Sequence, residues 1–102
     1  MRTHTTTPYT LAESTDNGYW LEHQGGEIRL PETASSGFAV NDFVEIIQST
    51  STPVTFVADT GSVVIEYNSA LFSLETRYQG GAVVLKCIAT NTWRIIGALA
   101  DV

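Results

Sequence analysis

The residues that could support catalysis or hold a metal ion are few and widely separated in this sequence. The two histidines are His4, in a threonine-rich N-terminal segment, and His23, at the end of a predicted strand. The single cysteine, Cys87, lies far from His23, and no HxH or CxxC pair is present. Zinc sites usually draw on closely spaced pairs of such ligands. We therefore expect no metal site and no cofactor.

Other catalytic patterns are equally weak. The acidic residues are spread singly, without the spacing of a calcium loop. No G-x-S-x-G elbow occurs, and the Gly-Gly pairs have no following lysine that would build a phosphate loop. A pair of carboxylates contributed by separate strands remains an open alternative for hydrolysis. The sequence as a whole predicts a protein that is not an enzyme.

Composition limits the partners that the chain can have. The 102 residues carry a formal net charge of -6, which repels phosphate backbones and anionic lipid surfaces. No apolar run approaches the roughly 18 residues of a membrane span, and the N-terminal MRTHTTTPYT contains no apolar signal core. We expect neither nucleic acid nor a membrane as partner, and synthesis in the cytoplasm. Cys87, flanked by Leu85 and Ile88, is expected to be a small buried hydrophobe.

The elements that must position these residues are predicted to be strands. Several runs are rich in β-branched and aromatic residues, and turn-forming residues separate them every eight to twelve positions or so. This pattern predicts an all-β fold, a compact antiparallel β-sandwich or barrel of about eight or nine short strands. We expect one β-domain over residues 10–102, preceded by an extended N-terminal arm over residues 1–9. The clearest predicted strands are Asp42–Gln48, Pro53–Ala58, Ser62–Tyr67, Ala82–Thr90 and Thr92–Ala98.

Two segments, Gln24–Gly26 and Gln79–Gly81, place Gln-Gly-Gly before an alternating run. Adjacent glycines can adopt the positive φ angles that a tight hairpin needs. The repetition predicts equivalent hairpin corners in a structure with two similar halves.

Alternation within the strands predicts which side chains face outward. In GYWLEHQ, Leu21 marks the inner face together with Tyr19 and His23, so Trp20 faces outward. In GEIRLP, Ile28 and Leu30 face inward, Arg29 faces outward, and Pro31 ends the strand. The runs FVEII and VVLKCI are apolar on nearly both faces, which predicts that a neighbouring subunit covers one of them.

The aromatic residues allow two interpretations. Phe43, Phe56 and Trp93 are expected to fill the core, whereas the outward Trp20 is expected at a protein interface or a glycan site. The polar N-terminal arm is expected to clamp a neighbour or to be disordered. The apolar C-terminal RIIGALADV is expected to pack onto the body or a partner. The candidate interface residues are Thr5, Pro8, Tyr9, Trp20 and Arg29.

From Tyr9 to Ala100 the chain resembles a small β-domain that recurs in tailed-bacteriophage virion proteins. The most specific pieces are the LP that closes an early strand, F-x-x-x-D-x-x-E-I-x-Q from Phe38 onward, PVTFVADTG, and NTWRIIG. Each piece is a structural signature, so the resemblance implies a fold and a location in the virion more directly than a task.

The chain lacks the stalks and repeats of fibre proteins that carry this domain. The resemblance therefore implies a short virion protein, made in the host cytoplasm, such as a capsid decoration or cementing protein bound to the major capsid protein. By analogy we expect a homotrimer. The alternative is a tail-fibre or adsorption module that binds a host glycan. A small enzyme or carbohydrate-binding module of cellular origin is a third class.

Overall fold

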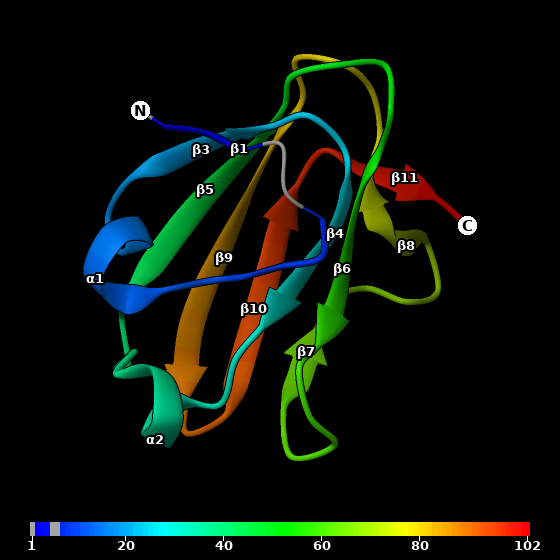
Figure 1. Cartoon of the computed structure of the whole chain (residues 1–102). Coiled ribbons are helices and arrows are strands. Elements are labelled where there is room, and N and C mark those ends of the chain that lie inside the picture. Colours follow the sequence, from blue (N-terminus) through cyan, green and yellow to red (C-terminus); the bar gives the residue numbers. More distant parts are fainter. Residues whose placement is uncertain (1, 5–6) are drawn as a thin grey trace.

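The computed structural model describes residues 2–4 and 7–102 and consists of two mixed β-sheets packed together (Figure 1). The six-stranded sheet has the order β1 (Arg2–His4), β3 (Trp20–His23), β5 (Phe43–Gln48), β9 (Ala82–Ala89), β10 (Thr92–Gly97), β7 (Val64–Glu66). The five-stranded sheet has the order β11 (Leu99–Asp101), β8 (Phe72–Thr76), β6 (Val54–Ala58), β4 (Gly26–Leu30), β2 (Tyr9–Thr10). Two short helices are α1 (Glu13–Asp16) and α2 (Thr33–Ser36).

The first half of the chain passes back and forth between the two sheets. Strands β1, β3 and β5 lie in the six-stranded sheet, and β2, β4 and β6 lie in the five-stranded sheet. Consecutive strands are therefore not neighbours, and each of β1 to β4 pairs in parallel with the next-but-one strand, as in β3 with β5 and β4 with β6. We call residues 2–4 and 7–58 the coil region. The all-β prediction is confirmed. The predicted antiparallel pairing throughout and the count of about eight or nine strands are wrong, because the described residues form eleven strands in two mixed sheets.

The rest of the chain, residues 62–102, is the closing region, and most of its pairs are antiparallel. Strand β9 lies between β5 and β10 and is antiparallel to both, while β8 is antiparallel to β6 and β11. Only β7 pairs in parallel, with β10. The apolar C-terminal run packs onto the body as β10 and β11, with Leu99 buried.

The first Gln-Gly-Gly segment is a crossing between sheets, not the predicted hairpin. It leads from β3 to β4, with φ of 112° at Gly25 and 93° at Gly26. The turns of adjacent coils are stacked here, because a Cβ on Gly25 would lie 2.6 Å from the Cβ of Thr52, and a Cβ on Gly26 would lie 2.7 Å from the Cβ of Thr7. Glycine is needed for its conformation and for the close approach of neighbouring turns.

The second Gln-Gly-Gly segment also crosses between sheets, from β8 to β9, with φ of 84° at Gly80. Both corners lie at the upper end of the molecule in Figure 1, beside the loop between β5 and β6. The Gly80 N–H donates to the Gln48 carbonyl over 2.7 Å, and the Ser49 N–H donates to the His23 carbonyl over 3.0 Å. The corners are thus close together, although the two halves of the chain differ in their strand pairing.

The core between the sheets follows the predicted alternation. Leu21, Ile28 and Leu30 are completely buried, and β4 ends at Leu30, before Pro31. Trp93 and Phe56 are buried as expected, but Phe43 is 44% exposed, so its assignment to the core is wrong. Phe43 lies on the opposite side of β5 from the buried Val44 and Ile46 and therefore faces out.

Trp93 joins the two regions of the chain. Its indole N–H donates a 3.0 Å hydrogen bond to the carbonyl of Pro31, at the end of β4. Its ring also meets Phe38 edge to face, with the ring centroids 4.9 Å apart. The closing strand β10 is in this way held against both ends of the connection from β4 to β5.

A buried pair of polar side chains lies below the upper corners. The Thr76 hydroxyl donates to Gln48 Oε1 over 2.5 Å and accepts the Val54 N–H over 2.9 Å. Gln48 Nε2 donates to the Thr50 carbonyl over 2.9 Å. Since these atoms are removed from water, the hydrogen bonds are needed to offset the cost of burying them.

The predicted N-terminal arm contributes to both sheets. Strand β1 pairs with β3, and β2 pairs with β4. Its described residues therefore pair with strands of their own chain and do not extend free of the body. Contact between this segment and a neighbouring subunit stays a prediction.

Candidate functional site

The outward-facing side of the six-stranded sheet gathers exposed apolar side chains, and we call it the outer face. One row crosses four adjacent strands in register, with Trp20 beside Glu45, Glu45 beside Val84, and Val84 beside Ile96. Trp20 is 47% exposed and Ile96 is 57% exposed. The apolar members of the outer face include Trp20, Phe43, Ile47, Val64, Val84, Ile88 and Ile96.

Charges on the outer face are divided between its two halves. Glu22 on β3 and Glu45 on β5 lie on one half, and Lys86 on β9 and Arg94 on β10 lie on the other. Arg94 donates to Glu66 on the edge strand β7 over 2.9 Å. Among the described residues no ion pair is found for the exposed Lys86.

The outward side of the five-stranded sheet is polar by comparison. Arg29 and Glu27 form an ion pair over 2.6 Å, and the hydrogen bond to Glu27 raises the pKa of Arg29 above its already high ordinary value. Thr55 and Glu75 lie side by side on β6 and β8. Of the two sheets, the six-stranded one therefore presents the apolar outward surface.

The five predicted interface residues do not form one cluster. Trp20 and Arg29 face outward from different sheets, on opposite sides of the molecule. Pro8 is exposed, whereas Tyr9 is half-buried and its hydroxyl donates to the buried Asp16 over 2.7 Å. Thr5 lies outside the described residues. Of this set, Trp20 alone lies on the outer face.

Sequence reasoning missed part of this surface although the signal was present. The runs FVEII and VVLKCI are apolar on nearly both faces, and the alternation of side chains along each strand places Phe43 and Val84 on the outer face. Phe43 was expected in the core, but it alternates along β5 with the buried Val44 and Ile46 and therefore faces outward. Tyr19 was predicted to share the inner side with Leu21, but it precedes β3 and is 56% exposed.

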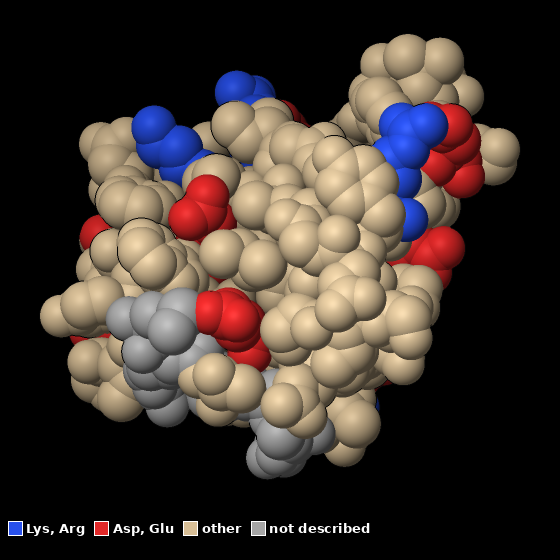
Figure 2. All heavy atoms as spheres, turned by 90° about the horizontal axis from the view of Figure 1, so that it is seen from above, with Lys and Arg blue, Asp and Glu red and all other residues tan. Residues whose placement is uncertain are grey.

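The end of the molecule that carries the corners has no single dominant charge in view. Figure 2 looks down on this end, and acidic and basic side chains appear there singly or in small groups among uncharged residues. The end is therefore a poor candidate for steering a strongly charged partner.

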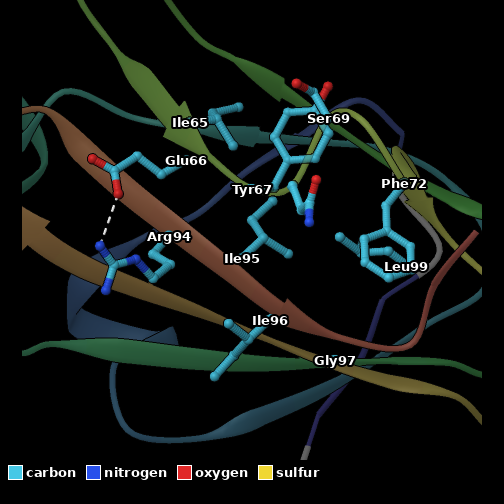
Figure 3. A pocket seen from close by; sticks show the side chains of 11 residues that line it. Ile65, Glu66, Tyr67, Ser69, Phe72, Arg94, Ile95, Ile96, Gly97 and Leu99 are labelled. Atoms are coloured by element: carbon cyan, nitrogen blue, oxygen red, sulfur yellow. Dashed lines mark hydrogen bonds and ion pairs between the residues drawn. The ribbon is translucent and has the colours of Figure 1, made fainter. Parts of the chain in front are cut away.

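A groove of about 680 Å³ opens where the sheets separate at β7 and β11 (Figure 3). Strand β7 pairs only with residues Thr92–Arg94 of β10, so the part of β10 from Ile95 to Gly97 borders the groove. Tyr67 and Phe72 add aromatic walls, and the Glu66–Arg94 ion pair lies at the side. Such a groove has room for apolar groups. No motif or spacing in the sequence predicted it.

Cys87 is buried, as the sequence predicted. Burial raises the pKa of its thiol, an effect that a backbone hydrogen bond at Ala89 opposes and the Asp42 charge reinforces. A thiol in such a setting is a weak nucleophile at neutral pH. Within the described part of the chain, no cluster of three or more histidine, cysteine or acidic side chains could hold a metal ion, and no helix is long and apolar enough to cross a membrane.

The chain was compared with protein-family models, with curated protein sequences and with solved structures. None of the three comparisons found a match. The resemblance to phage virion domains therefore stays a prediction from the sequence, and the outer face is the feature on which a functional proposal can be built.

Proposed function

We propose that this chain is a structural protein of a tailed-bacteriophage virion, a capsid decoration or cementing protein that binds the head lattice by protein contact and catalyses no reaction. Its partners are the major capsid protein and further copies of itself, with a trimer implied by the family resemblance. The observation that carries the proposal is the exposed apolar outer face of the six-stranded sheet.

The composition of the outer face supports a protein partner. Protein interfaces combine an apolar, aromatic centre with a polar rim. Here the apolar row of Trp20, Val84 and Ile96 is accompanied by Glu45 and Lys86, which can supply specificity. Interfaces of about 800 Å² per partner suffice for specific binding, and many copies on one lattice multiply the effect through avidity.

The test compares phage particles with and without the protein. Particles that lack it are expected to lose DNA or open at a lower temperature, and imaging should show its density on the head. A Val84→Lys variant, which places a charge in the centre of the outer face, is expected to abolish binding to stripped particles.

Val57→Lys is the matched control, because Val57 is half-buried and faces outward from the five-stranded sheet. It should bind like the wild type. Particles that keep full resistance to heat, low salt and internal pressure without the protein would refute cementing, and equal loss of binding by the two variants would refute the role of the outer face.

An adsorption module that binds a host glycan is the second candidate. The observation that favours it is the exposed Trp20 beside Glu45, since an aromatic ring and a carboxylate together can hold a sugar ring. The expected result is glycan-array binding that Trp20→Ala removes and Tyr78→Ala, at another exposed aromatic, leaves intact. Absence of binding by the wild type would exclude this candidate.

A further inference from the structure

We infer that the outer face packs against the same face of a second copy of the chain. The two copies are related by a two-fold axis that lies between the two faces, directly over the boundary between β5 and β9, and runs parallel to the strands. This inference rests on the proposed assembly role of the outer face and assigns that face to the contact between copies. Loss of the face would then weaken particle binding because unpaired copies lose the avidity of the pair. The argument comes from strand register and from the distribution of charge.

The strand order makes the outer face self-complementary under this symmetry. A two-fold axis between β5 and β9 exchanges these strands, and it also exchanges β3 with β10. Because Trp20 and Ile96 lie at opposite ends of one row, Trp20 of one copy would meet Ile96 of the other. The two most exposed apolar side chains of that row would cover each other.

The next row along the strands gives a second contact. Phe43 on β5 lies directly beside Lys86 on β9. The two-fold axis therefore places the Phe43 ring of one copy over the Lys86 ammonium of the other, an arrangement that favours a cation–π contact. Glu45, one row away from Lys86 along the strands, lies within reach of the same ammonium group of the other copy.

The distribution of charge points to a second copy as the occupant. The axis lays Glu45 of one copy over Val84 of the other, beside Lys86, so that opposite charges meet at the centre of the face. A chain with net charge -6 resists self-association over most of its surface. The outer face carries two of the five basic residues, and because Arg94 is paired with Glu66 of its own chain, Lys86 is the cation that Glu45 of the second copy can meet.

The geometry fits a reversible dimer. Sheets pack face to face at about 10 Å with strands nearly aligned. Four strands at about 4.8 Å spacing form a face roughly 20 Å wide, across which the two sheets can lie. A trimer, which the family resemblance implies, would need two different surfaces on each copy, and this pairing uses one.

The test is a charge exchange across the axis, read by sedimentation equilibrium of the purified full chain over a wide concentration range. Wild type is expected to form dimers. Glu45→Lys and Lys86→Glu should each raise the dimer dissociation constant about ten-fold or more, because like charges then meet. The double variant should return to within about three-fold of the wild type.

Glu75→Lys is the matched control. It changes the net charge by the same amount as Glu45→Lys but lies on the outward side of the five-stranded sheet, so dimerisation should not weaken. Far-UV circular dichroism verifies that each variant folds. If Glu45→Lys fails to fold, Ile96→Glu, at a position 57% exposed, replaces it and should also weaken the dimer.

A wild type that stays monomeric, a trimer mass, equal effects of Glu45→Lys and Glu75→Lys, or no recovery in the double variant would each overturn the inference. The outcomes separate it from the proposed function. Virions that carry the protein while the purified chain remains monomeric would refute the two-fold pairing alone. A two-fold dimer that never binds a particle would refute the decoration role alone.

Discussion

The coil region and the closing region build different strand arrangements. In the coil region each strand crosses to the other sheet, so that parallel neighbours come from successive coils. In the closing region β9 and β10 form a hairpin in one sheet, and antiparallel neighbours predominate. Both regions contain crossings between sheets, and the β9–β10 hairpin together with the antiparallel pairing of β8 with β6 and of β9 with β5 sets the closing region apart.

The comparison shows what the glycine pairs do. In the coil region, Gly25 and Gly26 lie against Thr52 and Thr7 of the neighbouring turns, whereas nothing lies within 4 Å of the Cβ position of Gly80. Close stacking of turns therefore restricts Gly25 and Gly26, whereas backbone conformation alone restricts Gly80. Substitutions can separate these two requirements.

The largest expected effect comes from breaking the link between the two regions. Trp93→Ala removes a completely buried side chain, the Phe38 contact and the hydrogen bond to Pro31, and should lower the free energy of unfolding by about 3 to 5 kcal/mol. Chemical denaturation followed by far-UV circular dichroism measures the loss.

The same variant tests whether the two regions unfold as one unit. Trp20, on β3, is then the remaining tryptophan, and its fluorescence reports on the coil region. We expect the fluorescence and circular dichroism transitions to coincide. A coil region that melts separately would contradict the joining role of Trp93.

A pair of glycine substitutions sharpens the comparison next. In Gly80→Ala the added Cβ contacts no other atom, so the cost comes from the positive φ alone and should be about 1 to 2 kcal/mol of unfolding free energy. Gly25→Ala adds the collision with Thr52 and should cost about 1 to 3 kcal/mol more. Equal losses in parallel denaturation experiments would show that the coil turns are not stacked as described.

Thr76→Val tests the polar contact between β8 of the closing region and β5 and β6 of the coil region. The isosteric change removes the partner of the buried Val54 N–H and should cost about 1 to 3 kcal/mol. Thr55→Val, at a half-buried outward position on β6, serves as the control and should change stability much less. Similar losses in the two variants would argue against a specific role of the buried network.

The smallest expected effect is the pH dependence contributed by Cys87. Burial raises the pKa of its thiol in the folded state, so its contribution to stability is complete below the ordinary thiol pKa of about 8.5 and declines as the pH rises through the folded-state pKa. Above about pH 8 the wild type should therefore lose more stability than Cys87→Ala in matched denaturation curves. Identical pH profiles would mean that the thiol ionises equally easily in the folded and unfolded chains.

Local features of the fold could be predicted from the sequence, and its topology could not. Alternation identified the buried Leu21, Ile28 and Leu30 and the outward Trp20, because facing is fixed by the period of a strand. The parallel pairing was missed because hairpins and crossings between sheets use the same glycine-rich turns. What distinguishes them at Gly25 is the nearby Thr52, 27 positions later in the chain, and such a contact leaves no local signal.

The candidate site was predictable to a similar extent. The runs of β5 and β9 are apolar on nearly both faces, which indicated that a second surface besides the core is covered. The alternation of side chains along β3 identified Trp20 as facing outward. The rows that bring Trp20, Val84 and Ile96 together depend on the register between β3, β5, β9 and β10, which no single segment contains. Arg29 was grouped with Trp20 because its assignment to a different sheet could not be seen.

Side-chain footprinting with hydroxyl radicals tests the role of the outer face most directly. The dilute purified chain would be compared with its assembled form, and Leu71 and Tyr78, 59% and 57% exposed at other places on the surface, would serve as internal references. The account predicts strong protection of Trp20, Phe43 and Ile96 on assembly while the references keep their reactivity. Unchanged reactivity of these three residues in the assembled form would contradict it.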